Sequence, residues 1–159
     1  APLCDGLTAV HRAGIVHRDV KAANVFIDDS FDQPRIVLLD FGLAIEVGET
    51  LRPPTVMGTP TCMAPEQIRG EPCDPRTDVY AVGALLFHLL TGRPPFWETT
   101  SLILDMHLHA PPPRPSELHP LPPGIDALIA RAMAKHPARR HPSVRALADE
   151  LLAIAHDAG

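Results

Sequence analysis

The chain has 159 residues, a formal net charge of −5, 45% hydrophobic residues and 21% charged residues. This length suits a single domain that buries about two thirds of its unfolded surface, so a disulfide framework is not needed. The acidic balance and the scattered basic residues argue against a nucleic-acid binder that works by bulk electrostatics. Cys4, Cys62 and Cys73 form no C-x-x-C pair, which argues against zinc and favours a reducing compartment.

Proline is abundant, but seven of the nineteen prolines lie between Pro111 and Pro123. They predict a rigid loop between helices, with a polyproline ligand as the less favoured alternative. No run approaches the roughly 18 apolar residues of a membrane span, and the N-terminus lacks a signal-peptide pattern. We therefore expect a cytoplasmic chain, although the full-length protein can carry a membrane anchor outside this segment.

The first dozen residues are predicted to form an amphipathic helix. Leu3, Leu7 and Val10 recur at three- and four-residue spacing, and Gly14 marks the end of the helix. The next ten residues, 15–24, carry too many charged side chains to be expected in a core element.

Two short strands are expected after this polar segment. Val25–Ile27 is apolar and is closed by two aspartates, and Ile36–Leu39 runs directly into Asp40. We expect a small hairpin-like platform that presents Asn24 and Asp40 together.

The second half of the chain is predicted to be helical. From Glu46 to about Pro75 the sequence lacks periodicity, which predicts a long functional or disordered loop. Residues 77–91 are apolar on nearly every face, which predicts a helix buried at the centre of a helical body and stopped by Gly92. Further helices are expected over 99–109, 125–134 and 143–155, the last with Ser143 as its N-cap.

Three motifs follow one another in a recognisable order. His17-Arg18-Asp19 with Asn24 matches H-R-D-x-x-x-x-N, Asp40-Phe41-Gly42 matches D-F-G, and Met63 to Glu66 contains A-P-E. Together they resemble the C-terminal lobe of serine/threonine protein kinases, and residues 58–67 resemble the bacterial eukaryotic-like type. The resemblance implies a mainly α fold with short β segments around the catalytic loop. It places the catalytic loop at 15–24, the activation segment at 40–66 and a helical subdomain at 77–157.

The resemblance also implies roles in phosphoryl transfer. Such transfer needs positioning and neutralisation of charge on phosphate oxygens. Asp19 would accept or orient the proton of the attacking hydroxyl, and Lys21 would hold the γ-phosphate of ATP and mark serine/threonine specificity. Asn24 and Asp40 would bind Mg²⁺, which prefers hard oxygen ligands. The strand that carries Phe26 would form one wall of the adenine pocket.

Taken singly, these residues have ordinary alternatives. Asp19 and Asp40 could be turn aspartates, Lys21 a solvated lysine and Asn24 a turn residue. The ordered motif set favours the catalytic interpretation. His17 and Phe41 are expected to be structural, because in the family they stack in an apolar spine.

Arg18, directly before Asp19, resembles the arginine of kinases that are regulated by phosphorylation of the activation segment. Thr50 or Thr55 would be the phosphoacceptor. Thr59 resembles the family threonine that hydrogen-bonds the catalytic aspartate and lysine.

Two features depart from the pattern of such kinases. Ile45 and Glu46 stand where a basic residue often follows D-F-G, and Cys62 replaces a larger residue. Regulation through the activation segment therefore remains a hypothesis.

Three further residues are expected to be structural. Glu66 and Arg139 match a buried ion pair of the family. Asp78 resembles a helix carboxylate that accepts hydrogen bonds from the backbone of the catalytic loop, with a plain N-cap role as the alternative.

The sequence contains no glycine-rich loop, strand lysine or partner glutamate helix, and its only lysines are Lys21 and Lys135. We therefore expect a partial kinase without its N-terminal lobe, inactive in isolation, whose partners are that missing lobe and a protein substrate with Ser or Thr. The alternative is a catalytically silent docking or regulatory module. Small-molecule phosphotransferases, a third class, ordinarily lack the A-P-E segment.

Overall fold

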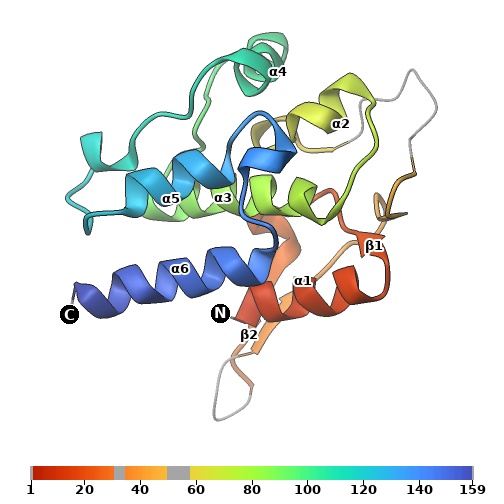
Figure 1. Cartoon of the computed structure of the whole chain (residues 1–159), viewed down its shortest axis with the longest axis horizontal. Coiled ribbons are helices and arrows are strands. Elements are labelled where there is room, and N and C mark those ends of the chain that lie inside the picture. The colour runs from red at the N-terminus through yellow and green to blue at the C-terminus, as the bar shows by residue number, and fades with distance from the viewer. Residues whose placement is uncertain (1, 31–34, 50–57, 159) are drawn as a thin grey trace.

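The computed structural model describes residues 2–30, 35–49 and 58–158, and the fold in these ranges is mainly helical (Figure 1). The α-helices are α1 (Pro2–Arg12), α2 (Pro65–Arg69), α3 (Pro75–Thr91), α4 (Thr100–His109), α5 (Ile125–Ala132) and α6 (Val144–Asp157). The strands are β1 (Ile15–Val16), β2 (Val25–Asp28), β3 (Arg35–Leu38) and β4 (Ile45–Glu46). Short 3₁₀ turns cover Ala22–Asn24, Pro60–Cys62, Pro115–Glu117 and Pro137–Arg139. The expected mainly α fold with short β segments near the polar loop is confirmed.

Helix α3 forms the centre of the helical body and packs against α5 and α6 (Figure 1). The approach of α3 to α5 is close, because a Cβ atom at Gly83 would lie 2.8 Å from the Cβ of Ala132. The helix begins at the N-cap Asp74, whose side chain accepts a hydrogen bond from the backbone N–H of Arg76, and ends at Gly92 with φ 75°. Its predicted position is confirmed, and its predicted burial is confirmed for residues 77–85 and Phe87, whereas Leu89 is 69% exposed.

The remaining helices complete this body. Helix α6 packs against α1, α3 and α5, and the hydroxyl of Ser143 accepts a hydrogen bond from the N–H of Ala146. Ser143 is therefore the N-cap that the sequence predicts. No helix within the described ranges is both long and apolar enough to cross a membrane.

Strands β2 and β3 form an antiparallel hairpin in which Val25 lies opposite Leu38 and Asp28 opposite Arg35. Beyond the ladder, the N–H of Leu39 donates to the carbonyl oxygen of Asn24 at 2.8 Å. Because Asp40 follows directly, the register brings Asn24 and Asp40 to the same end of the hairpin, as expected.

The polar segment 15–24 is more buried than its many charged side chains predict. Val16 to Val20, including His17, Arg18 and Asp19, are buried. The backbone N–H groups of His17 and Arg18 and the carboxylate of Asp19 can be buried because other segments satisfy them with hydrogen bonds. Strands β1 and β4 also pair here in antiparallel fashion, Ile15 opposite Glu46, although two residues are too few to show a periodic pattern.

The long segment before Pro75 contains more regular structure than its composition predicts. A 3₁₀ turn and helix α2 lie within it. Helix α2 has Pro65 in its first turn, and the Gln67 side chain accepts a hydrogen bond from the backbone N–H of Ala64. A helix of five residues is set by such end contacts and is too short to show a hydrophobic repeat.

Candidate active site

The loop that carries Asp19 is anchored to the buried helix α3 through Asp78. The Asp78 carboxylate accepts hydrogen bonds from the backbone N–H groups of His17 and Arg18, both at 2.9 Å. Its Oδ2 also lies 2.7 Å from Nε2 of His11 on α1. Asp74, not Asp78, caps α3, so the plain N-cap alternative is wrong.

Two non-glycine residues near the site have a left-handed backbone: Arg18 with φ 68° and Asp40 with φ 61°. This conformation is costly for residues with a Cβ and persists where neighbouring groups determine it. At Asp40, the carboxylate Oδ1 accepts the N–H of Gly42 at 3.0 Å, and a Cβ at Gly42 would approach the same oxygen to 3.0 Å. The tight turn therefore sets where the Asp40 carboxylate lies.

The Asp19 carboxylate is buried and receives four hydrogen bonds from three residues. Its Oδ2 accepts from Nζ of Lys21 at 2.6 Å and from Nδ2 of Asn24 at 3.0 Å. Its Oδ1 accepts from the hydroxyl of Thr59 at 2.8 Å and from the Thr59 backbone N–H at 3.2 Å. Lys21 also donates to the Thr59 hydroxyl at 2.7 Å. Residues 19–24 and Thr59, which are far apart in sequence, thus converge on one carboxylate.

Electrostatics keep this carboxylate ionised. Burial alone would raise the pKa of Asp19, but the hydrogen bonds from Lys21, Thr59 and Asn24, together with the charge of Lys21, outweigh it and hold the pKa below its ordinary value. Asp19 is therefore a fixed anionic acceptor at neutral pH.

Asn24 and Asp40 lie at one end of the hairpin, and their side-chain oxygen atoms differ in hydrogen bonding and exposure. The amide nitrogen of Asn24 donates to the carbonyl and the carboxylate of Asp19. This orientation leaves the amide oxygen as the Asn24 side-chain atom suited to a ligand. Asp40 is exposed, so its carboxylate is accessible from solvent.

His17 connects the buried loop to the D-F-G turn. Its ring lies 4.8 Å from that of Phe41 in an edge-on arrangement, and its Nε2 lies 3.2 Å from the carbonyl oxygen of Leu39. Its Nδ1 accepts the backbone N–H of Asp19 at 3.3 Å. The expected contact between His17 and Phe41 is thus present.

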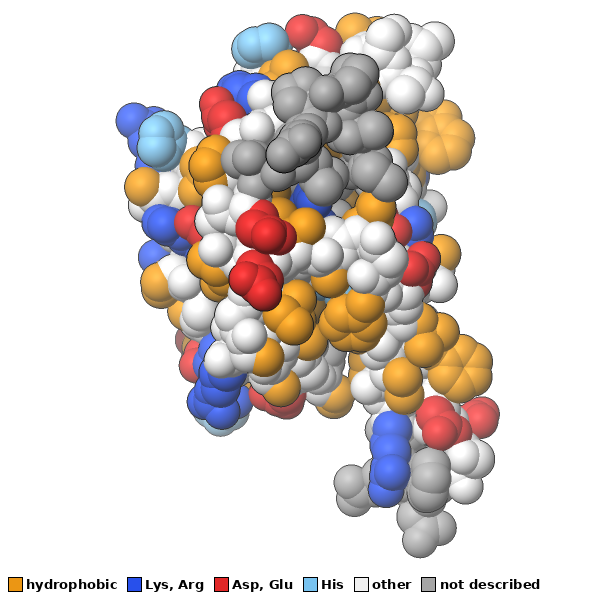
Figure 2. Space-filling view, turned by 90° about the vertical axis from the view of Figure 1, so that its right-hand side faces the viewer, with side chains coloured by type: hydrophobic (Ala, Val, Ile, Leu, Met, Phe, Trp, Pro, Cys, Tyr) orange, Lys and Arg blue, Asp and Glu red, His pale blue; other side chains and the backbone are white. Residues whose placement is uncertain are grey.

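Hydrophobic side chains on this side of the molecule remain exposed. Phe26 is 56% exposed and lies opposite Val37, which is also exposed, in the hairpin. Figure 2 shows large hydrophobic side chains at the surface next to the projecting end of the molecule. The hairpin therefore offers an open apolar face beside the polar site.

Arg18 differs from the other charged residues of the loop. Its side chain is buried, but Nε and Nη1 find no hydrogen-bond partner among the described residues. A buried guanidinium with two nitrogen atoms that no described residue contacts by a hydrogen bond is suited to an anion. Thr50 and Thr55, the expected phosphoacceptors, lie outside the described residues.

The predicted partner of Glu66 is wrong by one residue. Arg140, not Arg139, forms the buried pair, with Nη1–Oε1 at 2.6 Å and Nη2–Oε2 at 2.8 Å. Arg139 is exposed at the end of the 3₁₀ turn Pro137–Arg139. The turn decides which of two adjacent arginines points inward, and no sequence pattern distinguishes them.

Sequence reasoning also missed two residues that hold the loop. His11 contacts Asp78, and Gln67 donates from Nε2 to the carbonyl oxygen of Arg18 at 2.8 Å. Gln67 follows the A-P-E sequence directly, a position that could have drawn attention to it. His11 carries no such signal, because its helix shows only an amphipathic pattern.

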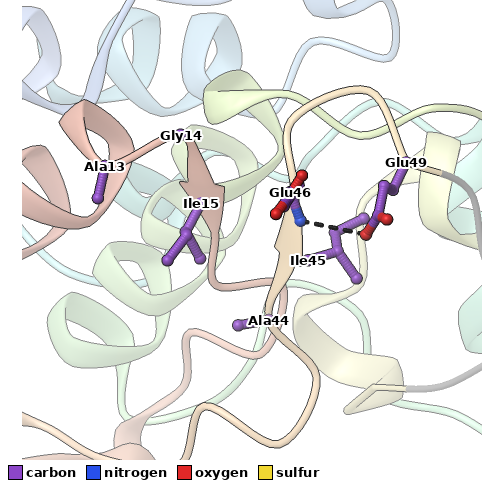
Figure 3. Close-up of a pocket in the computed structure, with 7 residues that line it drawn as sticks. All are labelled: Ala13, Gly14, Ile15, Ala44, Ile45, Glu46 and Glu49. Atoms are coloured by element: carbon purple, nitrogen blue, oxygen red, sulfur yellow. Dashed lines mark hydrogen bonds between the residues drawn. The ribbon is translucent and has the colours of Figure 1, made fainter.

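A surface pocket of about 520 Å³ lies beside the β1–β4 ladder. Figure 3 shows its lining, Ala13 to Ile15, Ala44 to Glu46 and Glu49, with the Glu46 backbone N–H donating to Glu49 Oε2 at 3.3 Å. Its lining includes the first residue of the catalytic loop and part of the activation segment, but none of the three residues that hydrogen-bond the Asp19 carboxylate.

Comparison with known proteins finds bacterial serine/threonine protein kinases as relatives. PknL, a serine/threonine-protein kinase of Mycobacterium tuberculosis, is 42% identical over 160 residues, which cover 98% of this chain and 39% of PknL. Probable serine/threonine-protein kinase PknB of Corynebacterium glutamicum is 38% identical over 167 residues, covering 99% of this chain and 25% of the relative. Pkn1 of Myxococcus xanthus is 40% identical over 156 residues, covering 94% of this chain and 22% of Pkn1.

The chain thus spans between about a fifth and two fifths of the length of these curated relatives. The sequence profile described as the protein kinase domain matches residues 1–153, nearly the whole chain and every group around Asp19. The chain belongs to the protein kinase domain family.

Proposed function

We propose that this chain forms the C-terminal lobe of a serine/threonine protein kinase, which transfers the γ-phosphoryl group of ATP to Ser or Thr hydroxyls of a protein. The observation that carries the proposal is the convergence of Lys21, Asn24 and Thr59 on the Asp19 carboxylate. The similarity to bacterial serine/threonine kinases supports it.

In this proposal Asp19 binds and orients the attacking hydroxyl. Its carboxylate is ionised and held in place, so it can accept the hydroxyl proton as the oxygen attacks. The ammonium of Lys21 lies 2.6 Å from this carboxylate and places positive charge where phosphate oxygens would gather. The hydroxyl of Thr59 joins both groups and holds them in a common geometry.

Asn24 and Asp40 would hold Mg²⁺. An amide oxygen and an exposed carboxylate at one end of the hairpin suit an ion that prefers a few hard oxygen ligands from the protein and takes the others from phosphates and water. Bound there, Mg²⁺ would neutralise charge on the phosphates of ATP. The exposed side chain of Phe26 on β2 would contact the adenine base.

Arg18 would respond to phosphorylation of the activation segment. Its buried guanidinium has two nitrogen atoms without partners among the described residues, and a phosphothreonine would supply oxygens for both. We propose Thr50 or Thr55 as the modified residue. Mass spectrometry of active protein should find the phosphate on one of them, and active protein without it would contradict this part of the proposal.

The test uses the full-length protein that contains this chain. We expect Asp19→Asn to lower the rate of phosphoryl transfer to a Ser/Thr peptide by about 10² to 10⁴-fold, because the acceptor for the hydroxyl proton is lost. Asp105→Asn, an exposed carboxylate on α4, serves as the matched control and should leave the rate unchanged.

Two results would contradict the proposal. If Asp19→Asn retained full activity, Asp19 would not be the catalytic residue. If the parent protein folded but transferred no phosphoryl group from Mg-ATP to any protein, a silent docking module would be favoured instead. Transfer to small molecules alone would point to a different phosphotransferase class.

A further inference from the structure

Gln67 occupies an unusual position between two segments of the site. It lies in the short helix α2 and is buried. Both ends of its amide are used: Oε1 accepts the backbone N–H of Ala64 at 3.1 Å, and Nε2 donates to the carbonyl oxygen of Arg18 at 2.8 Å. The second bond connects residues 49 positions apart.

The Arg18 carbonyl that accepts the hydrogen bond from Gln67 belongs to the peptide group directly before Asp19. The N–H of this same peptide group donates to Nδ1 of His17 at 3.3 Å, and the preceding N–H, of Arg18, donates to Asp78 at 2.9 Å. Arg18 has φ 68°, a conformation that persists only where surrounding contacts determine it. Among the described residues, Gln67 supplies the contact on the carbonyl side.

The segment 58–67 therefore contacts Asp19 in two ways. Thr59 hydrogen-bonds its carboxylate, and Gln67 fixes the peptide group before it. Gly58 lies close to the second contact, since a Cβ there would lie 3.7 Å from Nε2 of Gln67 and 3.8 Å from the oxygen of Arg18.

We propose that Gln67 is a positioning residue that holds the Arg18–Asp19 peptide group, and with it the Asp19 carboxylate, in its productive orientation. The inference rests on the proposed kinase function. It assigns to the residue that directly follows the activation segment a direct hydrogen bond to the backbone of the catalytic loop. A displacement of about 1 Å at a reacting group can cost about 10²-fold in rate, so this one hydrogen bond has a measurable consequence.

The chemistry of this position requires a donor and an acceptor on one side chain. An ionised glutamate can still accept the N–H of Ala64, but it has no proton to donate and sets a negative charge against the Arg18 carbonyl. Gln67→Glu therefore keeps the helix contact and removes the contact to the loop. Gln67→Met has a similar length and removes both contacts without adding charge.

The experiment compares both variants with the parent in the full-length protein. We expect kcat to fall about 10- to 100-fold in each, with KM for ATP and for peptide unchanged within about threefold. Amide hydrogen exchange at Asp19 should become about three- to tenfold faster, because the peptide group loses one of its contacts. In Gln67→Glu alone, kcat should recover as the pH is lowered, because a protonated carboxyl group can donate to Arg18 again.

Each outcome decides the proposal. Wild-type kcat and wild-type exchange in either folded variant would overturn it, and a fall in Gln67→Met only would assign the effect to the contact with Ala64. The parent could show no kinase activity while amide exchange at Asp19 still became faster in Gln67→Glu. In that case the proposed function would be contradicted, but the role of Gln67 in positioning the Arg18–Asp19 peptide group would be supported. If one variant failed to fold, the other would decide.

Discussion

The helical body has a core of fully buried hydrophobic side chains, although Leu89 on α3 is 69% exposed, whereas the β2–β3 hairpin leaves its large hydrophobic side chains at the surface. In the body, Tyr80, Phe87 and Leu128 are fully buried. In the hairpin, Phe26 and Ile27 are 56% and 60% exposed. Burial of apolar area is the main favourable term in folding, so the body accounts for most of the stability. The open face of the hairpin is available for binding.

Charged residues are likewise more buried in the helical body than near the hairpin. Glu66 and Arg140 form a fully buried pair with two parallel hydrogen bonds, whereas the Lys21 side chain beside Asp19 is 25% exposed. A buried pair holds two segments together, while a partly exposed pair remains accessible to a reactant. The predictions below test this division between a body that maintains the fold and a hairpin edge that we propose binds ATP.

The largest effect on stability is expected at the buried ion pair. Arg140→Met should lower the free energy of unfolding by about 3 to 5 kcal/mol, because the carboxylate of Glu66 is left buried without its partner. The neighbouring Arg139→Met should change it by less than about 0.5 kcal/mol, because Arg139 is exposed. Urea unfolding measures both values. Equal losses would contradict the assignment of Arg140.

A pH dependence is expected from His107 in the body. Burial, with the charge of Lys135 adding to it, lowers the pKa of His107 from 6.5 to about 4. Between these values the unfolded chain binds the proton and the folded chain does not, so stability falls as the pH drops from 6.5 to 4. The loss amounts to up to about 3 kcal/mol.

His107→Gln should remove this part of the pH dependence, since glutamine does not titrate but can still accept the hydrogen bond of the Tyr80 hydroxyl. Urea unfolding at several pH values between 6.5 and 4 tests this. An identical pH slope in parent and variant would show that His107 is protonated in the folded protein over this range.

A smaller loss is expected at the contact between α3 and α5. In Gly83→Ala the new Cβ would lie 2.8 Å from the Cβ of Ala132 and 3.0 Å from Cγ of Met133. The helices would have to move apart, at a cost of about 1 to 3 kcal/mol. Gly6→Ala in α1 meets nothing within 4 Å and should instead stabilise the protein by about 0.5 to 1 kcal/mol. A neutral Gly83→Ala would contradict the close packing.

The smallest effect on stability is expected in the hairpin. Phe26→Ser should change the free energy of unfolding by less than about 0.5 kcal/mol, because the ring is largely exposed. Leu128→Ala in the body should cost about 2 to 5 kcal/mol. If β2 contacts adenine as proposed, Phe26→Ser should weaken Mg-ATP binding, measured by titration of the full-length protein. If Phe26→Ser strongly destabilised the protein and left Mg-ATP binding unchanged, Phe26 would contribute to the fold and not to binding.

Much of the fold could be predicted because its signals are local. The apolar length of α3, the amphipathic spacing in α1 and the N-cap Ser143 all act within a few residues. Elements that are stabilised by contacts with distant segments were harder to predict from the sequence. Helix α2 and the two-residue strands β1 and β4 are too short to carry a periodic pattern, so only their partners determine them.

By itself, the sequence determined which chemical groups are present and in what order, because the motif from His17 to Asn24, the D-F-G turn and the A-P-E segment are local patterns. Only the tertiary structure decided which groups meet. It directed Arg140 rather than Arg139 toward Glu66, placed His11 against Asp78, and brought Gln67 to the carbonyl of Arg18. The physical reason is that a hydrogen bond between distant segments depends on the packing of the helices that carry them, and no spacing along the chain records that packing.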